Sequence, residues 1–187
     1  NPYFGFFFAT TTLIIAVPTA IKVYNWVLTL WQGNIHLRVP MLFAIGFIFT
    51  FTHGGLTGLF LGNVVIDLPL SDTYFVIGHF HMVMGVSPVL VLFGAIYHWY
   101  PKFTGRMLNE DLGRFHCALT FIGFNFCFGP QHWLGLNGMP RRVAEYDPQF
   151  TLINQISSVG ALLMAISTLP FLWNVIHSAF YGKVAGD

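Results

Sequence analysis

The chain has 187 residues, of which 55% are hydrophobic, 18% are aromatic and only 8% are charged. Soluble proteins carry about 25% charged residues, so the composition excludes a freely soluble globular domain, and the aromatic content excludes disorder. A formal net charge of +1 provides no basic surface, so we expect no nucleic-acid partner. The chain opens at Asn1 without Met and soon becomes apolar, so we interpret it as a piece of a longer polypeptide.

Apolar segments long enough to cross a bilayer follow one another along the chain. A hydrocarbon core about 30 Å thick needs roughly 20 residues of helix. Five segments reach that length: Tyr3–Trp31, Pro40–Val65, Asp72–Tyr100, Leu112–Leu136 and Phe150–Tyr181. Backbone polar groups in hydrocarbon must be paired within the chain, so these segments are helices. The sequence predicts an all-α polytopic transmembrane bundle in the lipid bilayer, with one domain over residues 1–187.

The loops hold most of the charge and predict the orientation. One side carries Arg38, Lys102, Arg106, Arg114 and Lys183; the other carries Asp67, Asp72, Arg141, Arg142, Glu145 and Asp147. The positive-inside rule places the first set in the cytoplasm or matrix. The chain start is then outside and Asp187 inside, with the Arg141–Arg142 pair as an exception to the rule.

Lys22 lies deep in the first predicted helix. It is about 14 Å from the inner end at Trp31, farther than a lysine side chain extends. We therefore expect it to face a hydrated cavity lined by protein. Thr19, three residues earlier on the same face, can relay a proton. The alternative is a lysine paired with a carbonyl or an acid.

Glycines recur every fourth residue in the second predicted helix, at Gly54, Gly58 and Gly62. Rows of small residues allow two helices to approach closely, so we expect tight packing there. In the fourth segment Cys117 and Cys127 lack metal-site spacing and are interpreted as buried, inert thiols. Four histidines near helix ends are expected at the membrane interface: His36, His98, His116 and His177.

The run Gly78-His79-Phe80-His81 lies inside the third predicted helix, where histidine is costly and usually functional. Helical residues turn by about 100° each, so the two imidazoles point about 200° apart. That geometry is unsuitable for two ligands on one metal but suits two separate groups, one on each side. Imidazole is an axial ligand of haem iron, so two haems flanking one helix are a specific hypothesis. Two hydrogen-bonded polar residues in a bundle remain the alternative.

Three runs resemble subunit I of the haem–copper cytochrome c oxidases. Residues 71–81, SDTYFVIGHFH, resemble the helix that carries both haem ligands. Residues 130–142, PQHWLGLNGMPRR, resemble the family's outer loop, and residues 18–23, PTAIKV, its helix with a proton-channel lysine. The resemblance runs end to end and corresponds to the last five of the family's twelve helices.

The resemblance implies roles for these residues. His79 would bind the high-spin, oxygen-reducing haem and His81 the low-spin, electron-transfer haem. Arg141 and Arg142 would bind haem propionates, which suits the planar guanidinium fork; a locally neutral loop with Glu145 and Asp147 is the alternative. Asp67 would lie near the propionates and hold a pumped proton, and Lys22 with Thr19 would belong to a proton route.

The resemblance also has gaps. Ser71-Asp72 stands where many members have His-Asp binding Mg²⁺, so Asp72 alone is left as a candidate ligand for a metal that prefers octahedral oxygen coordination. His53 occupies a position expected to be apolar; it is a core histidine or a departure with a role of its own. Copper ligands match nothing here and are expected outside this segment.

The resemblance implies a cytochrome-c oxidase of the aa3 type that reduces O₂ to water and pumps protons. It would carry two a-type haems and copper, work with oxidase subunits II and III, and take electrons from cytochrome c. The membrane would be a bacterial plasma membrane or the mitochondrial inner membrane. The alternatives are a quinol oxidase of the same family, a nitric oxide reductase, against which Lys22 argues, and a transporter or structural bundle without haem.

Overall fold

A computed structural model describes residues 2–186; Asn1 and Asp187, to which the sequence assigned opposite sides of the membrane, lie outside the described residues. The elements in chain order are α1 (Pro2–Leu30), α2 (Val39–Gly62), α3 (Val64–Leu70), α4 (Tyr74–Phe80), the π-helix η1 (His81–Val86), α5 (Ser87–Thr104), α6 (Glu110–Leu136), the 3₁₀ helix η2 (Pro148–Phe150) and α7 (Thr151–Tyr181). Over that range the only β pairing is two isolated bridges, so the all-α prediction is confirmed.

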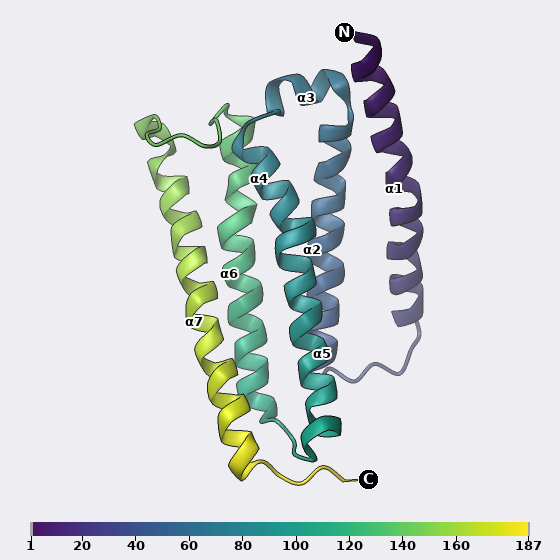
Figure 1. Cartoon of the computed structure of the whole chain (residues 1–187), viewed down its shortest axis with the longest axis vertical. Helices are drawn as coiled ribbons and strands as arrows, with labels where there is room; N and C mark the ends of the chain where they lie inside the picture. The colour runs from purple at the N-terminus through teal and green to yellow at the C-terminus, as the bar shows by residue number, and fades with distance from the viewer. Residues whose placement is uncertain (1, 187) are drawn as a thin grey trace.

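Five long passes run up and down the bundle: α1, α2, the continuous rod α4–η1–α5, α6 and α7 (Figure 1). Their bounds agree with the five predicted segments to within a few residues. The short helix α3 was not predicted; it crosses the end of the bundle between α2 and α4. The loop charges separate as expected, because the α1–α2 and α5–α6 connections lie at the end opposite to α3.

Four of the five passes are apolar and long enough to cross a membrane by composition: Tyr3–Leu30, Val39–Gly62, Tyr74–Thr104 and Pro148–Tyr181. The fifth, α6, is equally long but less apolar, because it carries two acids in its first turn and further polar side chains along its length. Several of those polar residues are buried, including His116, Thr120, Gln131 and His132. These polar side chains of α6 therefore face neighbouring helices, as expected of a pass that has helices on both sides.

The third pass is not a uniform α-helix, because a π-helical turn over His81–Val86 interrupts it. Pro88 follows directly, at the start of α5, and proline has no N–H to donate to the preceding turn. The Ser87 hydroxyl instead donates to the Met82 carbonyl at 2.7 Å. The widened turn thus begins at one of the two histidines that the sequence singled out, and π-helical turns are frequent at functional sites.

Glycine sets the closest approaches between passes. A Cβ built on Gly135 of α6 would overlap the backbone of Phe75 in α4, and one on Gly160 of α7 would overlap the backbone of Cys127 in α6. Any side chain at either position would push two helices apart. The apolar core lies toward the other end of α6, where Phe43, Leu90 and Phe124 pack together.

Candidate functional site

His79 projects from α4 toward α2. Its Nδ1 lies 2.8 Å from the Gly54 carbonyl oxygen and 3.1 Å from the Thr57 hydroxyl. Because a carbonyl oxygen only accepts, Nδ1 carries the hydrogen and Nε2 keeps its lone pair. When a histidine binds a metal through one ring nitrogen, a hydrogen bond of this kind from the other nitrogen fixes its tautomer.

The glycine row of α2 makes room for this ring. A Cβ on Gly58 would lie 2.8 Å from His79 Cε1 and 3.5 Å from Nε2, so a side chain there would fill the space beside the free nitrogen. Gly54 lies against Met82 and Val83 in the same way, and Gly62 against Leu13 of α1. The prediction of close helix packing is confirmed, and at Gly58 the missing side chain also leaves space for the His79 ring.

His81 lies on the side of the rod that faces α6. Its Nδ1 lies 2.9 Å from the Ile77 carbonyl, so this imidazole also presents an unprotonated Nε2. The ring stacks on Phe128 of α6, with centroids 4.3 Å apart and an interplanar angle of 8°. This stacking restricts the rotation of the His81 ring.

The two imidazoles therefore face different neighbours, α2 for His79 and α6 for His81, as the two-residue spacing predicts. Each has one nitrogen held by a backbone carbonyl and the other available as a lone-pair donor. That donor chemistry fits one axial position on each of two iron centres. It does not fit one metal shared by both rings.

The outer loop after α6 is tied to the start of α4. Arg141 donates to Asp72 Oδ1 from Nε at 2.8 Å and from its terminal nitrogen at 2.5 Å, and its backbone N–H donates to the Asp72 carbonyl at 2.9 Å. Tyr74 N–H donates to the Met139 carbonyl at 3.0 Å. Arg142 has a φ of 63° and an exposed side chain. The predicted propionate pair is thus split, with only Arg141 held by an acid.

Asp72 was also the predicted Mg²⁺ ligand. Over residues 2–186 no group of three His, Cys, Asp or Glu side chains could hold a metal ion. Asp72 belongs to no such group among these residues, and its Oδ1 already accepts two hydrogen bonds from Arg141. These residues do not fit a Mg²⁺ site within the described part of the chain.

Asp67 lies half-buried in α3, at the same end of the bundle as Asp72. Burial, and secondarily the negative charge of Asp72, raise the pKa of the Asp67 carboxyl above 3.8. The folded protein therefore binds a proton at Asp67 more tightly than the unfolded chain does. The role of Asp67 in holding a pumped proton near haem propionates remains a prediction.

We expect Asp72→Asn to lower the pKa of Asp67, because it removes the like charge that raises it. The burial contribution remains, so the pKa should stay above the ordinary value. The pH dependence of the Asp67 carboxyl stretching band in the infrared, assigned with Asp67→Asn, measures the change. An unchanged or raised pKa would contradict this electrostatic account.

Lys22 is exposed on α1, with its Nζ 5.9 Å from the centre of the Trp26 ring. Thr19 is half-buried, and its hydroxyl donates to the Ile15 carbonyl of its own helix at 2.9 Å. The structure therefore places both on α1 but brings neither to the histidines. Their role in a proton route remains a prediction.

Two expectations from the sequence were wrong in detail. Of the run 130–142, residues 130–136 are the last turns of α6, and the loop begins at Asn137. His116, expected at the interface, is fully buried, and its Nδ1 lies 3.1 Å from the Tyr97 hydroxyl. Closeness to a helix end does not decide which face a residue occupies. Cys117 and Cys127 are buried free thiols, as predicted.

The family described as "Cytochrome C and Quinol oxidase polypeptide I" matches residues 1–163. The chain belongs to this family. It is 62% identical to the "Alternative cytochrome c oxidase subunit 1" of Bradyrhizobium diazoefficiens, over 99% of this chain and 32% of that protein. It is 52% identical to "Cytochrome c oxidase subunit 1" of Thermostichus vulcanus, over 100% of this chain and 34% of that protein.

The fold agrees with this assignment. A solved structure described as a heme-copper terminal oxidase dimer superposes with a TM-score of 0.80, at 19% identity, over 99% of this chain and 38% of that chain. The chain thus spans about one third of the curated relatives and matches the C-terminal part of the oxidase polypeptide I. With its apolar passes, it is a segment of an integral membrane protein.

Several site residues of this oxidase polypeptide I segment could not be found from sequence alone. Thr57 and the Gly54 carbonyl hold His79, and Phe128 stacks on His81. The glycine row was a visible signal for the first contact. No local signal pointed to Phe128, one of 21 phenylalanines in the chain.

Proposed function

We propose that this chain is the haem-ligand part of a respiratory oxidase subunit I that reduces O₂ to water with electrons from cytochrome c and pumps protons. The observation that carries the proposal is the pair of imidazoles on opposite sides of one rod, each with a carbonyl-bound Nδ1 and a free Nε2. Family membership supports the same reading.

In this proposal the Nε2 of His79 would hold the high-spin haem and the Nε2 of His81 would hold the low-spin haem, and both haems would be a-type. The haems and a copper ion held by residues outside this segment supply the redox chemistry when bound. The chain's own residues orient the two ligands, with Gly58 leaving space beside His79 and Phe128 fixing the plane of His81. Arg141, Arg142 and Asp67 lie at one end of the bundle, where propionates would be held and a proton stored.

The test is a reduced-minus-oxidised visible spectrum of the full-length protein purified from its membrane. We expect bands of two a-type haems and O₂ uptake with reduced cytochrome c. A spectrum without haem bands would overturn the proposal in favour of a transporter or structural bundle. Activity with a quinol and none with cytochrome c would instead indicate a quinol oxidase, a class that the same family includes.

We further propose that subunits II and III accompany the chain in a bacterial plasma membrane or the mitochondrial inner membrane. Lys22 and Thr19 would then serve proton uptake from the inner side. A lysine inside a membrane span is costly and usually functional, which supports this role.

Lys22→Met should strongly slow reduction of the high-spin haem, because the substitution removes the ionisable group while keeping an unbranched side chain. The measurement is stopped-flow reduction under anaerobic conditions, with the low-spin haem followed in parallel. Lys102→Met, on an exposed turn of α5, is the matched control and should leave the rate unchanged. Near-normal reduction in Lys22→Met would count against the proton route.

A further inference from the structure

His132 of α6 carries a polar atom that the bundle leaves unpaired. The residue is 8% exposed, and its Nδ1 lies 3.2 Å and 3.3 Å from the carbonyl oxygens of Phe128 and Gly129. Nδ1 therefore carries the hydrogen, and Nε2 is a buried acceptor without a hydrogen-bond partner among the described residues. Buried acceptors in folded proteins normally receive a hydrogen bond, either from a side chain or from an ordered water.

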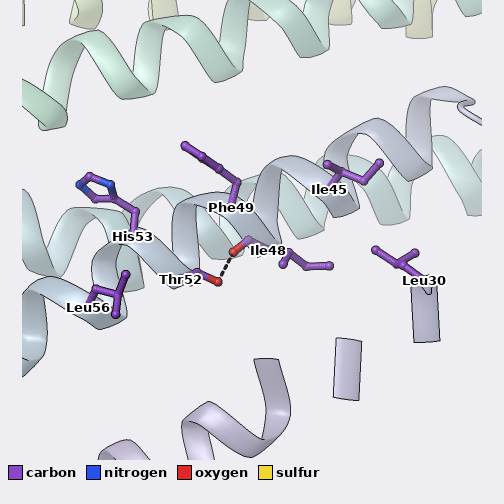
Figure 2. A pocket seen from close by; sticks show the side chains of 7 residues that line it. All are labelled: Leu30, Ile45, Ile48, Phe49, Thr52, His53 and Leu56. Atoms are coloured by element: carbon purple, nitrogen blue, oxygen red, sulfur yellow. Dashed lines mark hydrogen bonds between the residues drawn. The ribbon is translucent and has the colours of Figure 1, made fainter. Parts of the chain in front are cut away.

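The neighbouring imidazole is His53 of α2, the residue whose presence the sequence resemblance did not explain. The two ring centres are 5.4 Å apart, at an interplanar angle of 72°. Figure 2 shows His53 and Phe49 leaving α2 on the same side, and Phe49 packs on Phe121 of α6. His53 is exposed and, with Thr52, supplies the polar side chains of a groove of about 410 Å³.

His132 bears directly on the turn of α4 that carries His79. A Cβ on Gly78 would lie 2.8 Å from both Cε1 and Nδ1 of His132, so the ring rests on the backbone of the residue preceding His79. On the same side, Phe75 meets the ring edge-on, with centres 5.1 Å apart. A change in the orientation of His132 would therefore move the backbone that aims His79.

We propose that His53 is a positioning residue for His79, acting through His132. A neutral imidazole has one N–H in either tautomer, so His53 acts as the donor for His132 Nε2 through one bridging water molecule. The bond fixes His132 against Gly78 and thereby the direction of the His79 ring. The proposal rests on the proposed function, in that His79 holds the high-spin haem.

The test uses the full-length oxidase with three variants: His53→Leu, which removes the donor, His53→Gln, which keeps one, and Phe49→Leu as a packing control on the same face. The readout is the iron–histidine stretching band of the reduced high-spin haem in the resonance Raman spectrum. We expect His53→Leu to shift and broaden this band, His53→Gln to restore it, and Phe49→Leu to leave it unchanged. The low-spin haem bands should be constant throughout.

An unshifted band in His53→Leu would overturn the proposal, and so would a shift that His53→Gln does not restore, since packing alone would then explain it. If His53→Leu does not assemble, a high-resolution map of the wild-type complex decides: a water must lie within hydrogen-bonding distance of both His132 Nε2 and a ring nitrogen of His53. A wild-type protein without haem bands would overturn the proposed function instead.

Discussion

His81→Leu is expected to abolish the low-spin haem signal and to lower oxygen consumption far below wild type. In the proposed function the free Nε2 of His81 is the ligand atom for the low-spin haem, and leucine offers none. Loss of an outer-shell partner already weakens metal binding roughly 10–100-fold, so loss of the ligand itself should exceed that. The reduced-minus-oxidised spectrum and O₂ uptake with reduced cytochrome c measure the two effects.

A matched control separates the loss of a ligand from the loss of any histidine in this pass. The control is His98→Leu, farther along the same rod, where the exposed imidazole lies 3.3 Å from Lys102 Nζ and meets the Trp99 ring edge-on. It should keep both haem signals. Retention of a normal low-spin signal in His81→Leu would show that His81 is a hydrogen-bonded residue of the bundle.

Gly135→Ala is expected to prevent assembly of a stable bundle. The added methyl group would overlap the backbone of Phe75, which cannot rotate aside as a side chain can. Overpacked cores lose about 1–3 kcal/mol when side chains can adjust, and here α4 must move as a whole. Because α4 carries His79, the haem signals should fall together with the thermal midpoint of the solubilised complex.

Gly129→Ala on the same helix is the control, because a Cβ there meets nothing within 4 Å among the described residues. Replacing glycine by alanine within a helix stabilises it by up to about 1 kcal/mol. The thermal midpoint should therefore be unchanged or slightly higher. A normal yield and midpoint for Gly135→Ala would show that the α4–α6 contact is looser than described.

The sequence was sufficient to predict the five passes and the opposite directions of His79 and His81, because these are local properties. Hydropathy over about 20 residues locates a membrane span wherever its neighbours are, and the 100° helical turn separates His79 from His81 before any packing is known. The glycine row on α2 likewise predicted a close contact between helices, but it did not identify the residue of the other helix.

Only the tertiary structure decided the partners. The Asp72–Arg141 ion pair joins residues that are far apart in the chain. His116 is buried because α6 packs against several helices. His53 contacts His132 only because α2 and α6 lie side by side at that level. Such contacts depend on the order and spacing of whole helices, which one-dimensional periodicity does not contain. The sequence by itself determined that the two imidazoles leave opposite faces of one helix; the packing of the bundle determined what holds each imidazole in place.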